Sequence, residues 1–366
     1  MPKNPCQSLD EEATSGSISP TGIGGHSLVQ GFMKGITVAL TLLALLRAAS
    51  ALGQPVALDD PLASRNLSPV YQALGIPPLE SATALGAQKW QTRLAMNIAS
   101  HAVRESVPGQ TLEFDGETVR SDFSFDVGLS NTISLSLNIP LLHHSGGELD
   151  SLIDDWHALF GLPDGPRATQ PRDELLFTVG EADVTSLTDS TSGLGDIELS
   201  LSAQIIASES IDASLLLHHK FATGEELDYL GSGAASTAAG ARLSAKNCVL
   251  ESLSCHGQLG VLRTDADPLG LPADTITPYT SVGIAWRLAS TVTLLAQMDY
   301  HGEVFRSRLL TENGSPLWGS LGVRWRAGKS WYLDASFAED LAVGASPDIN
   351  FRFSFTYRPV FDPSKK

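Results

Sequence analysis

The stretch His143-His144-Ser145-Gly146-Gly147 holds residue types that could carry out nucleophilic chemistry. The apolar alternation before it predicts a strand, and residues two apart on a strand point to the same side. His143 would then lie beside Ser145, as a general base must lie beside its hydroxyl nucleophile. The alternative is a polar loop entry with the two histidines near lipid headgroups. Three acidic residues could orient the imidazole: Asp150, Asp154 and Glu174.

Metal binding is a second chemistry to consider in this region. Asp150, Asp154 and His157 share one face of a helix predicted over residues 148–160, with His144 just before it. The solvated face of an amphipathic helix has the same spacing, however, because its apolar residues take the opposite face. We therefore predict no metal site and no cofactor, and calcium enters only if the protein is a lipid hydrolase.

Charged residues of both signs alternate with apolar ones along most of the chain after residue 86. If the apolar side meets lipid, the polar side lines a lumen. These charges either pair across the lumen and brace it, or line a permeation path that the connection 143–195 constricts. The predicted lumen-facing residues are Arg93, Asn97, Arg120, Asp122, Asp126, Asn138, Glu198, Gln204, Lys220, Asp299, Arg324, Arg326, Asp334, Arg352 and Arg358.

The alternating stretches number about twelve, and the connections between them are short and long in turn. This pattern is typical of an all-β transmembrane antiparallel barrel in an outer membrane, with short periplasmic turns and long outer loops. The strand-like segment 173–183 is assigned to a hairpin within the connection 143–195, because a further barrel strand would break the alternation. The predicted long connections are 102–117, 143–195, 222–234, 263–278, 302–316 and 339–348.

The alternative fold is a soluble all-β sandwich. Aromatic residues near the strand ends favour the barrel, because tryptophan and tyrosine gather at membrane–water interfaces. These residues are Trp90, Trp286, Trp325, Trp331 and Tyr357.

The N-terminal region predicts export. The apolar run Ile36 to Leu46 is too short to span a bilayer, follows Met33-Lys34 and leads to Ala49-Ser50-Ala51, as in a Sec-type signal peptide. We expect residues 1–53 to be leader, in which either Met33 is the true start or the n-region is unusually long. Residues 54–86 are expected to form a periplasmic segment. The barrel is predicted over 87–361, followed by a tail, 362–366.

The net charge limits the classes of partner that the chain can bind. The net charge of −17 argues against nucleic acid, and outer-membrane lipid, lipopolysaccharide and the barrel-insertion machinery are the expected partners.

With Cys6 lost in the leader, Cys248 and Cys255 either form a disulfide or remain free thiols. A disulfide across so small a loop would stabilise the fold by about 2–3 kcal/mol.

Several stretches together resemble an uncharacterised Gram-negative outer-membrane family, domain of unknown function "three-one-eight-seven". The resemblance implies an outer-membrane barrel and no established activity. Separately, the His-x-Ser pattern on an outer face resembles outer-membrane phospholipase A and the lipid A deacylases. The family resemblance is carried by Tyr71 to Pro77, His144 to Asp150, Trp156 to Gly165, Gly193 to Asp196, Thr223 to Glu225 and Gly231 to Gly233.

Three functions therefore compete. The first is a pore or channel for small solutes, which we expect. The second is a membrane-embedded lipid esterase or deacylase that uses Ser145 and His143, and the third is a plugged structural or surface-interaction barrel. An enzyme is the less expected outcome.

Overall fold

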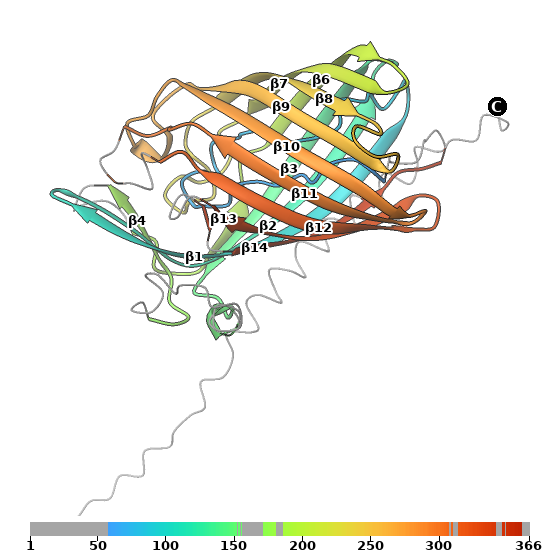
Figure 1. The fold of residues 1–366 in the computed structure, drawn as a ribbon. Coiled ribbons are helices and arrows are strands. Elements are labelled where there is room, and N and C mark those ends of the chain that lie inside the picture. Colours follow the sequence, from blue (N-terminus) through green and yellow to red (C-terminus); the bar gives the residue numbers. More distant parts are fainter. Residues whose placement is uncertain are drawn as a thin grey trace, which may run out of the picture.

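The structure, a computed structural model, describes residues 58–151, 153, 155, 171–180, 186–306, 309, 314–341, 346–347 and 349–360. Twelve antiparallel strands of this part pair with their neighbours in one closed ring, and pairing of β1 with β14 completes it (Figure 1). The barrel strands are β1 (Trp90–Val107), β2 (Gln110–Gly128), β3 (Ile133–Ser145), β6 (Glu198–Ala207), β7 (Ile211–Lys220), β8 (Ser236–Ala245), β9 (Leu253–Thr264), β10 (Ile276–Ala289), β11 (Val292–His301), β12 (Leu317–Ala327), β13 (Trp331–Asp340) and β14 (Ile349–Tyr357).

The ring confirms the predicted fold class and strand number. Its outer face is apolar: Leu294, Leu321 and Phe353 are 40 %, 53 % and 48 % exposed, whereas their polar sequence neighbours are buried inside. Pairing satisfies every ladder in the ring, so no open sheet edge is left to face lipid. No helix among the described residues is long and apolar enough to cross a membrane.

The two ends of the barrel differ. One end carries the short turns and the other carries the long connections, and we call them the short-turn end and the long-loop end. At the short-turn end, Trp331 stacks on Phe355 and contacts Tyr357, which also contacts Trp90. Such an aromatic group marks a membrane–water interface.

One of the predicted long loops is not a loop. Residues 102–117 form a tight hairpin instead of a loop, because β1 and β2 stay paired as far as Val107 and Gln110. This extension projects beyond the ring and pairs with the short strand β4 (Leu176–Gly180) (Figure 1). Alternation fails there as a signal because both faces of the extension lie outside the bilayer.

The long connection 143–195 is also shorter than predicted at both of its ends. β3 continues to Ser145, and the short strand β5 (Thr191–Leu194) pairs with it. In place of the hairpin predicted at 173–183, the described residues form the single strand β4, which lies outside the ring and pairs with β2. The predicted helix 148–160 lies mostly outside the described residues. A short 3-10 turn, η2 (Pro268–Gly270), lies in the connection between β9 and β10.

Residues 58–86, which we call the inner segment, lie inside the ring (Figure 1). The sequence predicted a periplasmic segment here, and the described part of it is instead lodged in the lumen. Its apolar residues have no periodicity because they do not share one face: Leu67 and Leu74 are buried among side chains of the barrel and its loops. The chain is therefore a barrel that contains its own N-terminal segment.

Candidate functional site: the lumen and the segment that fills it

The inner segment runs up the lumen and back down again. Near its start, Asp59 accepts a hydrogen bond from Ser254 at the short-turn end of β9 (2.8 Å). Further along, Ser64 bonds Ser320 at the long-loop end of β12 (2.8 Å). The way back is marked by Leu85, whose backbone N–H donates to Ser134 Oγ near the start of β3 (3.1 Å). Both ends of the inner segment therefore lie at the short-turn end.

The contacts between the inner segment and the wall are largely polar. Backbone N–H groups of Ala82 and Ala84 donate to Ser244 Oγ and Gln204 Oε1, each at 2.9 Å. Backbone carbonyls of Pro77 and Pro78 accept from Gln258 and Arg242 at 2.9 and 3.0 Å. An irregular segment buried in a barrel needs such partners, because its own backbone makes few internal hydrogen bonds.

Ion pairs add to this polar interface. Arg65 of the inner segment binds Glu198 with both guanidinium nitrogens, at 3.0 and 2.6 Å. Glu198 also pairs with Arg120 of the wall (3.2 Å), and Arg120 pairs with Asp122 (3.0 Å). Arg65 of the inner segment is thus part of a network of charged side chains inside the lumen.

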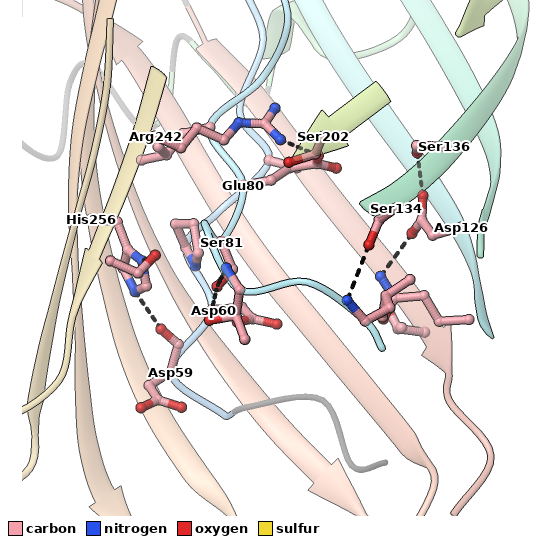
Figure 2. A pocket seen from close by; sticks show the side chains of 18 of the residues that line it. Asp59, Asp60, Glu80, Ser81, Asp126, Ser134, Ser136, Ser202, Arg242 and His256 are labelled. Carbon is pink, nitrogen blue, oxygen red and sulfur yellow. Dashed lines mark hydrogen bonds and ion pairs between the residues drawn. The ribbon is translucent and has the colours of Figure 1, made fainter. Parts of the chain in front are cut away.

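A cavity of about 270 Å³ remains between the inner segment and the wall in the short-turn half of the barrel (Figure 2). Five arginines line it, and we call them the arginine cluster. Figure 2 shows Arg242 reaching Glu80 across this space, with Asp59 next to His256 and Asp126 next to Ser136. The arginine cluster is Arg93, Arg242, Arg324, Arg352 and Arg358.

The predicted lumen-facing residues all lie on the inner side of the wall. Several pair with one another, as Arg324 does with Asp334 (2.8 Å) and Arg352 with Asn97 (3.1 Å). The others are held by neighbours in the same way or line the cavities around the inner segment. The residues predicted to face the lumen are Arg93, Asn97, Arg120, Asp122, Asp126, Asn138, Glu198, Gln204, Lys220, Asp299, Arg324, Arg326, Asp334, Arg352 and Arg358.

Sequence reasoning missed the partners that the inner segment brings. Asp60, Arg65 and Glu80 are charged residues in a segment that otherwise lacks regular structure, and nothing in their spacing points to the lumen. Arg242 was missed because the alternation in β8 is weak, with four alanines and a glycine among its ten residues. The useful signal would have been the three acidic residues and one arginine in a segment flanked by export signal and barrel.

The long-loop end is closed by an apolar cluster, which we call the outer cap. The tip of the inner segment enters it: Tyr71 contacts the rings of His301 (4.9 Å between centroids) and Phe305 (5.9 Å). Phe177 of β4 packs edge-on against Phe114 and Tyr229. The outer cap consists of Val70, Tyr71, Leu74, Val103, Leu112, Phe114, Leu175, Phe177, Val179, Leu187, Tyr229, Ala238, Leu262, Leu271, Tyr279, Val304, Phe305 and Leu309.

A buried ion pair stands beside the outer cap. Lys220 Nζ donates to Asp196 Oδ2 (2.6 Å), and the same carboxylate accepts from the backbone N–H groups of Thr223 and Gly224, each at 2.9 Å. Ser232 N–H donates to it as well (3.1 Å). Three of the short sequence stretches that carry the family resemblance, around Asp196, Thr223 and Ser232, therefore meet at one point.

The proposed nucleophile–base pair is not formed. His143 Nδ1 lies 3.0 Å from the carbonyl oxygen of Thr191 and 2.7 Å from Ser192 Oγ, so its partners are on β5. Ser145 is buried, and its Oγ has no hydrogen-bond partner among the described residues. The next residue, Gly146, lies against the chain at Asp173, whose carbonyl a Cβ on Gly146 would touch. Ser145 therefore faces protein and not acyl chains.

The remaining candidates of that region have other positions. His144 is fully buried between Thr118 Oγ1 (2.9 Å) and the Tyr229 carbonyl (3.2 Å). Asp150 accepts from the backbone N–H of Asp173 (2.9 Å), and Glu174 is exposed. Asp154 and His157 lie outside the described residues.

The structure contains the disulfide between Cys248 and Cys255. It closes the short turn between β8 and β9, with the two Cα atoms 5.9 Å apart. Disulfides persist in oxidising compartments, so this bond agrees with a periplasmic position of the short-turn end.

A closed ring of twelve strands with an apolar outer face and a polar lumen defines an outer-membrane β-barrel. A family model matches residues 37–359, and the chain belongs to that family, described as Protein of unknown function (DUF3187). No protein with curated annotation matches the sequence.

Several solved structures are similar to this chain, and the first of them shares its fold. The COG4313 outer membrane channel from Pseudomonas putida F1 superposes with a TM-score of 0.52 at 12 % identity, covering 77 % of this chain and 98 % of that one. The Ralstonia pickettii toluene transporter TbuX gives 0.40 at 11 % identity, with 80 % and 98 % covered. A KdgM porin in complex with disordered oligogalacturonate gives 0.40 at 9 % identity, with 73 % and 98 % covered.

Proposed function

We propose that the protein is an outer-membrane channel for small solutes whose lumen is closed by the inner segment. The observation that carries this proposal is the polar nature of the interface between segment and wall. Serine, glutamine, arginine and carboxylate groups face the inner segment, and all of them are well solvated by water when it leaves. Withdrawal of the inner segment therefore exposes a polar wall, at the cost of uncovering the apolar contacts of Leu58, Leu62 and the tip.

Position in the cell follows from the same features. The apolar outer face contacts lipid, and we propose that lipopolysaccharide surrounds the long-loop end and that the barrel-insertion machinery assembles the chain. Export through the Sec pathway is part of the proposal, on the strength of the segment around Ile36 to Leu46.

A permanently plugged structural barrel is the competing function. The ion pair of Arg65 with Glu198 and the outer cap favour it, because both hold the inner segment in place. Conductance separates the two functions, since a permanently filled barrel passes no ions.

The experiment is a reversible tether between the inner segment and the wall. Ser64 Oγ and Ser320 Oγ are 2.8 Å apart and both residues are buried, so the double variant Ser64→Cys/Ser320→Cys is positioned to form a disulfide. We expect the oxidised double variant to be silent in planar bilayers and to conduct after reduction. A variant that lacks residues 58–84 should conduct, because the inner segment no longer fills the lumen and the outer cap loses Val70, Tyr71 and Leu74.

Two controls accompany the tether. The single variant Ser64→Cys should behave like the unmodified protein with and without reductant. The unmodified protein under reductant accounts for loss of the Cys248–Cys255 bond. An inserted barrel without residues 58–84 that carries no current would rule out the channel.

A further inference from the structure

The carboxylate of Glu80 lies between two arginines of the wall. Arg242 Nη1 donates to Glu80 Oε2 (3.0 Å), while Arg93 Nη1 lies 3.8 Å from Glu80 Oε1. Each carboxylate oxygen therefore faces a different guanidinium, one on β8 and one on β1. The inner segment thus delivers a carboxylate to a site that the wall provides.

Other acceptors of the inner segment serve the same cluster. Arg242 Nη2 donates to the Pro78 carbonyl (3.0 Å), and Arg324 Nη1 donates to the Asp60 carbonyl (2.7 Å). Arg358 is 9 % exposed, and its Nε has no hydrogen-bond partner among the described residues. The arginine cluster therefore takes several of its hydrogen-bond acceptors from the inner segment. Arg358 Nε is a donor that has no acceptor among the described residues.

The charge around the cavity changes when the inner segment leaves. Among the described residues that line it, six are arginine or lysine and five are aspartate or glutamate. Three of the five acidic residues (Asp59, Asp60 and Glu80) belong to the inner segment, and all six basic residues belong to the wall. Two acidic residues then remain against six basic ones, so the emptied half of the lumen has a strongly positive potential.

We propose that Arg242 and Arg93 form a binding site for the carboxylate of a small organic anion, which Glu80 occupies while the channel is closed. This proposal rests on the proposed channel function and names the class of its solute. An anion that enters the cavity supplies the acceptors that Glu80 supplies in the closed state. Anionic solutes therefore both permeate and favour release of the inner segment.

The first test measures ion selectivity of the variant that lacks residues 58–84, from reversal potentials in gradients of potassium chloride and potassium acetate. We expect anions to be favoured over potassium by about threefold, because basic rings select anions. Arg242→Gln in the same background should lower that ratio toward one. The matched control is Arg263→Gln, since Arg263 is 68 % exposed on β9 and lies outside the cavity.

The second test uses the full chain and does not need the channel to open. Glu80→Ala removes the carboxylate and leaves the arginines in place, so the thermal midpoint of the detergent-solubilised barrel should fall. Sodium acetate should restore part of the loss relative to sodium chloride at equal ionic strength. Thr83→Ala is the matched control: it removes a bond from the inner segment to Asp212 (2.7 Å) that acetate cannot replace.

The outcomes separate the two proposals. Absence of current from every variant, with acetate rescue of Glu80→Ala intact, contradicts the channel and leaves the carboxylate site standing. A conducting barrel that prefers cations, together with no acetate rescue, overturns the carboxylate site and leaves the channel standing.

Discussion

At the scale of single residues, Asp196 and Lys220 form a buried ion pair at the long-loop end. Lys220 is 1 % exposed, and its ammonium donates to Asp196, Ser232 Oγ and the Ala234 carbonyl. All three ammonium hydrogens thus have acceptors, which is what a buried lysine needs. Removal of one partner leaves the other charge buried and unpaired.

Lys220→Met should therefore destabilise the barrel by about 3–5 kcal/mol, the usual cost of breaking a buried pair from one side. Urea unfolding in lipid vesicles measures this change. Lys246→Met is the control, because Lys246 is 48 % exposed and stands 3.7 Å from Asp212. Its effect should stay within about 0.5 kcal/mol, and equal losses in both variants would contradict the special role of Lys220.

At the scale of elements, the inner segment is held at its tip by a close approach of backbone to side chain. Gly75 has φ of +77°, and a Cβ there would lie 2.7 Å from Cβ of Lys220. Leu74 next to it accepts a hydrogen bond from Ser236 Oγ through its carbonyl (2.6 Å). The tip therefore fits against the wall only with glycine at this position.

Gly75→Val should push the tip away from Lys220 and raise the open probability of the channel in bilayer recordings. The matched control is Gly109→Val in the hairpin between β1 and β2. Gly109 has φ of +88° and open space around its Cβ position, so the two variants share the backbone strain and differ in the clash. The prediction is wrong if Gly109→Val opens the channel as much as Gly75→Val does.

The elements also show where sequence reasoning works and where it stops. Alternation and the lengths of the connections together predicted twelve barrel strands, because a strand between lipid and lumen has two chemically different faces. The alternation is weak in β8, where small residues prevail. It did not reveal the inner segment, whose hydrogen bonds run to residues far along the chain, such as Ser64 to Ser320. It also could not show that His143 takes its hydrogen-bond partners from β5, at Thr191 and Ser192, and not from Ser145.

At the scale of the whole molecule, the outer surface is a band of aliphatic and aromatic side chains around the ring. Leu294 on β11 and Val323 on β12 lie opposite each other in this band and are 40 % and 38 % exposed. Outside a membrane such a continuous apolar surface would drive aggregation. The band is therefore where the barrel meets acyl chains.

Leu321→Arg should cost about 2–4 kcal/mol in unfolding experiments from vesicles, because Leu321 is 53 % exposed near the middle of β12 and arginine costs most at the bilayer midplane. The control is Leu227→Arg, in the connection between β7 and β8, where the leucine is 62 % exposed beyond the ring. It should unfold like the unmodified protein. A negligible effect at both positions would mean that the band does not contact lipid.

The route of the inner segment has a consequence for how it can leave. The described part of the inner segment has both of its ends, Asp59 and Leu85, at the same opening, so it forms a loop whose tip points toward the far rim. Such a loop can be withdrawn and reinserted without breaking the pairing between any two strands of the ring. A force that acts on the inner segment from the short-turn end would thus open the lumen directly, while the surrounding barrel stays folded.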